Sequence, residues 1–370
     1  MARAWAEVDL GAVRRNVATL RRVAHPAEVC AVVKADGYGH GAVAVGRAAL
    51  EAGAAWLAVA QVNELVALRS AGIDAPLLLL SEPRPDEVDT AVASGARLTV
   101  YSQATVSAIA AAARRRGGSP VAVHLKVDTG MRRVGVEPAD AVATAKAVAA
   151  LDPLVLEGIC THLPVADEPG NPFTDAQIDR FTAVLDELRA AGLGPQIVHA
   201  ANSAGAIAHP RARFDMVRTG IAVYGIPPAP ALAGRVDLFP ALTLASEVSF
   251  VKRVRAGEGV SYGLRQRVER DTVVGTVPIG YADGVVRALP LAGQDVLVRG
   301  RRCPMVGVVT MDQLVIDLGP GSDVAPGEQV VLLGAQGGER ITPDDWAERL
   351  GTISYEVVCA IGGRVERRYR

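Results

Sequence analysis

Hydrophobic and polar residues alternate in blocks over the first 220 residues of the chain. Eight apolar runs have the length of buried strands, at 28–34, 56–60, 76–81, 97–101, 121–128, 155–162, 196–201 and 214–219. Helical patterns lie between most of them, for example at 62–71 and 175–191, and most end at a glycine. This alternation predicts the α/β class and a parallel (β/α)8 barrel of the TIM type over residues 1–235. A doubly wound open sheet is the alternative, which the lack of a G-x-G-x-x-G motif after the first strand disfavours.

The pattern changes after about residue 235. Prolines at 227, 228, 230 and 240 indicate a linker, and short β-type runs follow at 243–254, 273–279, 296–298, 305–318 and 329–333. Turns rich in glycine and proline separate these runs, and helical patterns are few. We therefore predict a mainly β C-terminal domain over residues 236–370, with which a short first strand at 5–9 can pack.

Composition narrows the class of function. Half of the residues are hydrophobic and the net charge is -1, which suits a large core and indicates no polyanionic partner such as nucleic acid. No apolar run reaches membrane-spanning length, and the N-terminus lacks the apolar segment of a secretion signal, so we expect a cytoplasmic protein. The four cysteines show no metal-ligand spacing, so no metal site is predicted, and Cys30 and Cys160 are expected to be core thiols.

A lysine stands at the end of the first of the eight strands. Lys34 follows the apolar run 29–33 and precedes Asp-Gly-Tyr-Gly-His at 36–40, a segment typical of a tight turn. Burial at a strand end lowers the pKa of an ammonium group and yields a neutral amine that can form a Schiff base. The alternative is a surface lysine whose amine reaches water. Because the chain holds 39 lysines and arginines but only four lysines, solubility alone does not explain a lysine here.

Chemically useful residues recur where barrel strands end, which is where barrel enzymes carry their active sites. Strands one, five, six, seven and eight run into Lys34, Lys126, His162, Ser203 and Arg218. The segments 202–203 and 220–221 add a hydroxyl and backbone N–H groups that can bind an anion. An amine beside an anion site indicates pyridoxal phosphate. Arg218 is the candidate partner of the cofactor ring nitrogen, and since a guanidinium only donates, that nitrogen would stay unprotonated.

The same residues carry a resemblance to a known family. Segments 31–41, 126–133, 161–162, 199–203, 218–221, 260–263, 280–287, 311–312 and 354–356 look like the motifs of alanine racemases. The match spans nearly the whole chain and keeps the motif order. The resemblance implies a barrel followed by a β domain, and a head-to-tail homodimer with shared active sites.

The resemblance also implies a two-base mechanism. Lys34 would serve the D-alanine side of the substrate, and Tyr262, contributed by the partner subunit, would serve the L-alanine side. A free tyrosine has a pKa of about 10, so Tyr262 needs a lowered pKa or a proton relay. By the family pattern, His162 contacts Tyr262 and Arg218 contacts His162. Without the family, Tyr262 could be an ordinary strand tyrosine and His162 a core histidine.

Further roles follow from the family pattern. Tyr38, Asn202, Ser203, Gly220, Ile221 and Tyr355 would bind the cofactor. Arg133 and the backbone of the partner's Met311 would hold the substrate carboxylate, Tyr281 would narrow the entry, and Asp312 and Arg287 belong to the same motifs. Lys126 would be carbamylated and steady Arg133; the alternative is an unmodified Lys126 paired with an acidic neighbour.

Three other functions remain open at this point. The first is a serine or broad-specificity racemase of the same fold. The second is a non-catalytic pyridoxal-phosphate carrier, which in its family is a barrel alone. The third is an amino-acid decarboxylase of the same fold, which normally has an acidic group where Arg218 stands. For an alanine racemase, the family role is to supply D-alanine for peptidoglycan.

Overall fold

The computed structural model describes residues 3–370, which form two compact units. One unit comprises residues 11–37 and 42–239. The other comprises residues 3–10, 38–41 and 240–370. Within the described chain, none of the helices combines the length and the apolar composition that crossing a membrane requires.

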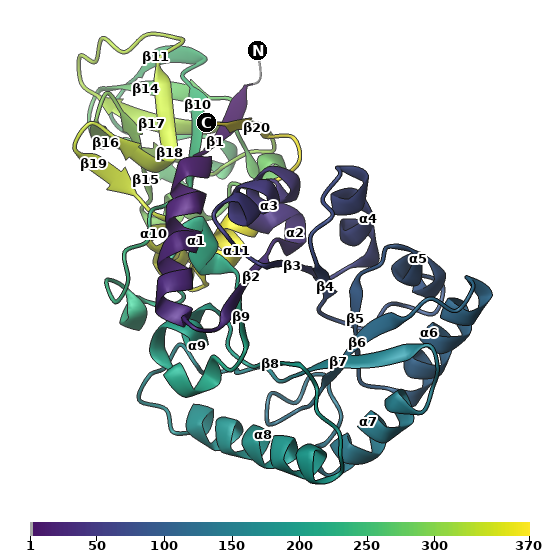
Figure 1. Cartoon of the computed structure of the whole chain (residues 1–370). Helices are drawn as coiled ribbons and strands as arrows, with labels where there is room; N and C mark the ends of the chain where they lie inside the picture. The colour runs from purple at the N-terminus through teal and green to yellow at the C-terminus, as the bar shows by residue number, and fades with distance from the viewer. Residues whose placement is uncertain (1–2) are drawn as a thin grey trace. The chain divides into compact units, whose positions relative to one another are not determined.

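The unit of residues 11–37 and 42–239 is built around a ring of eight parallel strands (Figure 1). The strands are β2 (Glu28–Val32), β3 (Trp56–Val59), β4 (Leu77–Leu79), β5 (Arg97–Val100), β6 (Val121–Lys126), β7 (Leu154–Cys160), β8 (Ile197–His199) and β9 (Met216–Thr219). Each lies within or beside one of the eight apolar runs, and their order is β8-β7-β6-β5-β4-β3-β2-β9. Backbone bonds from Arg218 N to Ala201 O and from Asp215 N to Val198 O link β9 to the β8 segment. The barrel prediction is confirmed and the open-sheet alternative is wrong.

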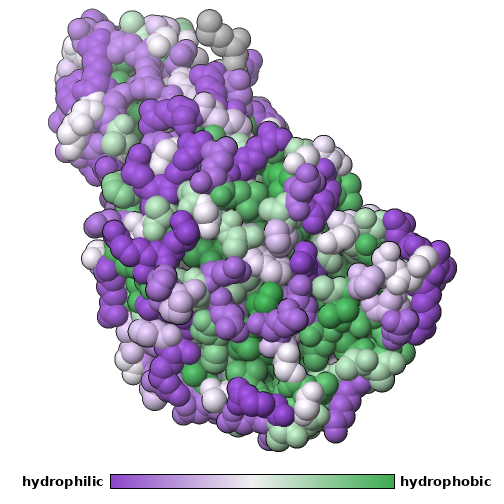
Figure 2. All heavy atoms as spheres, viewed as in Figure 1, coloured by the Kyte–Doolittle hydropathy of each residue, from purple (hydrophilic) through white to green (hydrophobic). Residues whose placement is uncertain are grey.

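Amphipathic helices cover the outside of this ring (Figure 1). They are α1 (Leu10–Ala24), α3 (Ala42–Glu51), α4 (Val62–Ser70), α5 (Val88–Ala93), α6 (Gln103–Arg115), α7 (Ala141–Ala149), α8 (Phe173–Ala190) and the short α9 (Ser203–Ala208). In α6, Val106, Ile109, Ala110 and Ala113 form one buried face, and Ser102 caps the helix by accepting from Thr105 N. Figure 2 shows hydrophilic residues over the outer helices and apolar residues gathered over the middle of the barrel.

The other unit contains a ten-stranded sheet whose core includes Leu244, Leu297, Leu332 and Trp346. Its elements are β1 (Ala4–Val8), β10 (Leu242–Glu247), β11 (Phe250–Val254), β14 (Thr272–Val277), β15 (Asp295–Val298), β16 (Arg301–Val306), β17 (Leu314–Gly319), β18 (Gln329–Gln336), β19 (Glu339–Ile341), β20 (Glu366–Tyr369), α10 (Pro343–Leu350) and α11 (Ser354–Cys359). A separate ribbon joins β12 (Gly259–Val260) to β13 (Gln266–Arg267). Strand β1 pairs antiparallel with β10 and parallel with β20, so the N-terminal strand is part of this sheet.

The structure corrects three details of the sequence prediction in this unit. The run 243–254 is two strands, because β10 pairs with β1 and β18 whereas β11 pairs with β14. The run 305–318 is likewise divided between β16 and β17. Helices α10 and α11 were not predicted, although Thr342 and Asp345 form a capping box ahead of α10.

Candidate active site

Lys34 begins a left-handed turn at the carboxyl end of β2. Ala35, Asp36 and Tyr38 have φ angles of 53°, 49° and 51°, which L-residues adopt at a cost of roughly 1–2 kcal/mol each. Local hydrogen bonds offset this strain: Asp36 Oδ1 accepts from Ala42 N at 2.9 Å, and Ala35 N donates to Glu64. Lys34 itself is half-buried. The fold therefore holds the turn after Lys34 in one conformation, as expected where the side chain of a functional residue must point in a fixed direction.

The next residues of this turn, 38–41, belong to the unit of residues 3–10, 38–41 and 240–370, the sheet unit. The rings of Tyr38 and Tyr355 lie 6.2 Å apart, centroid to centroid. A side chain at Gly39 would lie 2.3 Å from Val358 O, so only glycine permits this close approach. Burial and the neighbouring Tyr355 raise the pKa of Tyr38, which keeps its hydroxyl protonated and able to donate.

The loops after β8 and β9 meet at one hydroxyl. Ser203 Oγ accepts from Gly220 N at 2.9 Å and lies 3.4 Å from Ala222 N. Asn202 caps α9 by accepting from Gly205 N at 2.9 Å. Ser203, Gly220 and Ile221 are buried. The two segments that the sequence analysis assigned to an anion are thus joined in a cluster of backbone N–H groups around Ser203.

Arg218, in β9, is buried and held by four hydrogen bonds. Its Nη1 donates to His199 Nδ1 at 2.7 Å, and its Nη2 lies 2.8 Å from Thr161 O, 3.0 Å from Ala200 O and 3.2 Å from His162 Nδ1. Within residues 3–370 it makes no ion pair with a carboxylate, and its Nε–H donates to none of the described residues. The Nε–H group of Arg218 is therefore still available as a donor, on a guanidinium that is rigidly held.

His162 is neutral in this environment. Burial, and then the positive charges of Arg218, Lys126, Arg133 and Lys34, hold the pKa of His162 well below its usual value. Because the Arg218 guanidinium can only donate, His162 Nδ1 accepts and the ring proton sits on Nε2. The four charged residues that set this electrostatic environment all come from the unit of residues 11–37 and 42–239, the barrel unit.

Lys126 ends β6 and is half-buried. Burial lowers its pKa, as do the charges of Arg218, Arg133 and Lys34, while Cys160 acts in the opposite direction. Among the ion pairs formed by residues 3–370 none involves Lys126. Arg133 is exposed, in a loop that Asp128 Oδ1 braces by accepting from Gly130 N and Arg132 N.

The remaining candidate residues lie in the sheet unit and are exposed, except Asp312, which is half-buried. Tyr262 is 73% exposed, in a turn after β12 where Ser261 and Gly263 have positive φ angles. Ser261 Oγ holds this turn by donating to Val308 O at 2.8 Å. A depression of about 440 Å³ is lined by Tyr262, Thr310 and five neighbours in the same unit.

Tyr281 and Met311 are brought together by backbone hydrogen bonds. Tyr281 N donates to Thr310 O at 3.0 Å and Ala282 N donates to Met311 O at 3.1 Å. Asp312 pairs with Arg364 at 2.6 Å, which braces the same loop. Arg287 is exposed after this turn.

Sequence reasoning assigned no role to three residues that the structure connects to Arg218, although His199 lies in the motif segment 199–203. His199 contacts it directly, His124 contacts His199, and Glu157 contacts His124. His199 was visible as a polar residue at a strand end. Nothing in the local sequence signals that His124 and Glu157 face the same interior.

Comparison with known proteins gives the family of this architecture. Residues 8–228 match the model of the alanine racemase N-terminal domain, and residues 241–369 match that of the C-terminal domain. The chain belongs to the alanine racemase family. It is therefore an isomerase of this family.

Individual members of the alanine racemase family match over nearly their whole length. The alanine racemase of Symbiobacterium thermophilum is 50% identical over 365 residues, covering 99% of this chain and 96% of the relative. That of Mycobacterium tuberculosis is 46% identical, with 99% and 96% coverage. The crystal structure of alanine racemase from Streptomyces lavendulae superimposes with a TM-score of 0.94 at 40% identity, covering 100% of this chain and 97% of that one.

Proposed function

We propose that this chain interconverts L-alanine and D-alanine with pyridoxal 5′-phosphate as its cofactor. The observation that carries the proposal is the set of groups at the carboxyl ends of the barrel strands: the Lys34 amine, the N–H cluster at Ser203 and the spare Nε–H of Arg218. They match the aldehyde, the phosphate and the ring nitrogen of this cofactor. When bound, the cofactor withdraws electrons from the substrate and makes its Cα–H acidic.

Several side chains would hold the cofactor. Lys34 would bind its aldehyde, and Ser203, Gly220 and Ile221 would bind its phosphate together with Tyr38 and Tyr355. Asn202 supports this cradle by capping α9. Arg218 would donate from Nε to the ring nitrogen, and since a guanidinium has no acceptor, it keeps that nitrogen unprotonated. An unprotonated ring is a weaker electron sink, which favours simple proton transfer over transamination.

Two bases would move the proton across Cα. Lys34 would act on the face from which D-alanine loses its proton, and Tyr262 of the partner subunit on the face of L-alanine. His162, neutral and protonated at Nε2, would donate to the Tyr262 oxygen and stabilise its deprotonated form. Its Nδ1 is occupied by Arg218, so His162 presents only this donor to a phenolate.

The substrate carboxylate would be held by Arg133 and by the backbone of the partner's Met311, with Tyr281 narrowing the entry. We also propose that Lys126 is carbamylated. A neutral amine is required to add CO2, and the lowered pKa of Lys126 provides one. The resulting carboxylate would lie among Arg133, Arg218 and Lys34, which otherwise repel one another.

Exposure of the sheet residues supports a homodimer. Tyr262, Met311 and Tyr281 are 73%, 53% and 43% exposed. A base that exchanges protons with Cα works best where water is excluded. A second copy that covers these residues would supply that exclusion, and the active sites would then be shared. Production of D-alanine for peptidoglycan in the cytoplasm is the biological role that the family suggests.

The decisive experiment combines a spectrum with a turnover panel. The purified holoenzyme should show the absorption band of bound cofactor, and borohydride should trap the cofactor on Lys34. Turnover of L-alanine, L-serine and larger amino acids then separates an alanine racemase from a broad-specificity racemase. A bound cofactor without turnover of any of them would identify a carrier, and no trapped adduct on Lys34 would refute the cofactor assignment.

A further inference from the structure

A continuous line of hydrogen bonds runs from Arg218 through the interior of the barrel. Arg218 Nη1 contacts His199 Nδ1 at 2.7 Å, His199 Nε2 contacts His124 Nδ1 at 2.8 Å, and His124 Nε2 contacts Glu157 Oε2 at 3.1 Å. Arg97 closes the line through its Nε, 3.1 Å from the same oxygen. Arg218, His199 and His124 are 6%, 1% and 0% exposed. Water therefore cannot replace the bonds among these three residues.

Only one arrangement of protons satisfies this line. Arg218 can only donate, so His199 Nδ1 accepts and its proton lies on Nε2. His199 Nε2 then donates to His124 Nδ1, and His124 Nε2 donates to Glu157. The carboxylate only accepts, so it ends a chain in which every bond points the same way. Both imidazoles must be neutral. Burial and the charge of Arg218 lower the pKa of both rings, and Arg97 also lowers that of His124, although Glu157 acts in the opposite direction there.

The register of β6 and β7 makes room for the contact between His124 and Glu157. The β6–β7 register shifts so that Val123 pairs with Leu156 and His124 with Gly158, which leaves Glu157 as the extra residue of a bulge. A side chain at Gly158 would lie 2.6 Å from His124 Nδ1, so glycine gives the ring its space. The Trp56 ring packs edge-on against His124, with ring centroids 5.9 Å apart.

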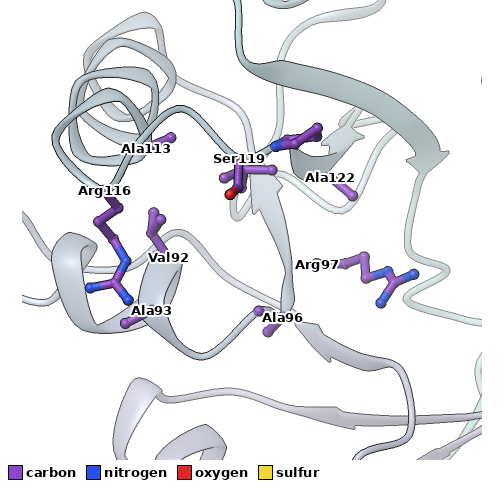
Figure 3. Close-up of a pocket in the computed structure, with 11 residues that line it drawn as sticks. Val92, Ala93, Ala96, Arg97, Ala113, Arg116, Ser119 and Ala122 are labelled. Atoms are coloured by element: carbon purple, nitrogen blue, oxygen red, sulfur yellow. The ribbon is translucent and has the colours of Figure 1, made fainter.

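The far end of the line reaches solvent. Arg97 is the first residue of β5 and lines a pocket of about 400 Å³ at the amino ends of β5 and β6. Figure 3 shows Arg97 on the strand side of this pocket and Arg116 on the helix side. The Glu157 side chain is 17% exposed, and its hydrogen bonds from His124 and Arg97 lower its pKa although burial raises it. Glu157 is thus an ionised group near the amino ends of the strands, whereas the proposed site lies at their carboxyl ends.

We propose that Glu157 and His124 are positioning residues for the racemase site, acting through His199 on Arg218. Arg218 has no carboxylate partner of its own among the described residues. Glu157 supplies the negative end of a polarised chain that holds the guanidinium with its Nε–H available. The effect on catalysis rests on the proposed function. The tautomers of His199 and His124 follow from the hydrogen-bond geometry alone.

Two variants separate the roles of the acceptor oxygen and of the charge. Glu157→Leu leaves His124 Nε2–H without an acceptor. If both imidazoles reversed instead, His199 Nδ1–H would face Arg218 Nη1–H across 2.7 Å, and two donors repel. The first outcome leaves a buried donor unpaired and the second repels Arg218, so no arrangement of protons satisfies the line in this variant. Glu157→Gln keeps an oxygen for His124 and removes only the charge. Glu51→Gln is the matched control, because it breaks the exposed Glu51–Arg14 ion pair of the same unit.

The first measurement uses the wild-type holoenzyme labelled with ¹⁵N-histidine. Between about pH 6 and 9 we expect His199 and His124 each to carry one proton, on Nε2, and neither to titrate. The ¹⁵N shifts of the two ring nitrogens report this directly and need no variant. A proton on His199 Nδ1, or titration of either ring in this range, would overturn the inference.

The second measurement compares the variants in steady-state kinetics and in the same spectra. We expect Glu157→Leu to lose the single tautomer and to lower kcat roughly tenfold in both directions, with KM nearly unchanged. Glu157→Gln should keep the tautomers with a smaller loss of kcat, and Glu51→Gln should match wild type. Unchanged kcat in Glu157→Leu, or equal losses in both Glu157 variants with wild-type tautomers, would contradict a positioning role. If wild-type protein lacks racemase activity, the proposed function fails, whereas the wild-type tautomers decide the hydrogen-bond chain independently.

Discussion

Removing one exposed hydroxyl tests the two-base proposal most directly. In Tyr262→Phe the ring stays and the proposed L-side base is lost. The side chain is 73% exposed, so the free energy of unfolding should change by less than about 0.5 kcal/mol. A general base contributes roughly 10²–10⁴-fold to rate, so racemisation should fall by that factor.

The assay must look at each face of the substrate separately. L-alanine and D-alanine have equal free energies in water, so kcat/KM must fall equally in both directions and cannot reveal which base is missing. Exchange of the Cα proton with D2O can reveal it. With Lys34 intact, Tyr262→Phe should still exchange the Cα proton of D-alanine without inverting it, and should exchange that of L-alanine slowly.

A buried tyrosine provides the contrasting control. Tyr224 is fully buried, and its hydroxyl donates to Val32 O at 2.9 Å. Tyr224→Phe should cost about 1 kcal/mol of stability, measured by denaturant titration. The two-base reasoning is refuted if Tyr262→Phe racemises alanine at a rate close to wild type, or if it exchanges both enantiomers at the same reduced rate.

Three further predictions concern residues at the carboxyl ends of the barrel strands. Carbamylation requires the neutral amine of Lys126, so ¹³C-bicarbonate should label Lys126 at and above neutral pH, and the label should disappear as pH falls. Lys126→Ala removes the proposed support of Arg133 and should raise KM roughly tenfold. Arg218→Leu removes a positive charge beside His162, so the His162 pKa should rise, and ¹⁵N spectra that show no shift would disprove this coupling. Burial raises the pKa of Asp128, but backbone N–H donors lower it by more, so the net shift is downward. Asp128 therefore stabilises the fold above its unfolded pKa of about 4 and loses this contribution as pH falls through the lower folded value. Asp128→Ala should cost about 1–2 kcal/mol of stability at pH 7, and a cost that persists at pH 2 would contradict the linkage.

Local sequence predicted the barrel well because parallel strands are buried on both faces. Such strands read as continuous apolar runs, as in Leu77–Leu79, and each is separated from the next by a helix with its own periodicity. The sheet unit was harder to read. Strands β10 and β11 are divided only by Val248 and Ser249, and what separates them is a change of pairing partner that the residues themselves do not record.

The candidate site divides in the same way. The rule that strand ends form one rim of a barrel was enough to group Lys34, Lys126, His162 and Arg218, and the electrostatic coupling of His162 to the other three agrees with that grouping. The rule could not predict the hydrogen bonds of Arg218. Those depend on the directions in which side chains leave neighbouring strands, to within a fraction of an ångström.

By itself, the sequence determined the order of strands and helices, the lysine at the end of β2 and the motifs of the family, since these depend on neighbouring residues and on spacing. Only the tertiary structure decided that Arg218 reaches Glu157 through His199 and His124. The physical reason is the one-residue register shift between β6 and β7, which pairs His124 with Gly158 and leaves Glu157 as the extra, unpaired residue beside it. Register is a property of two paired strands, and neither strand encodes it alone.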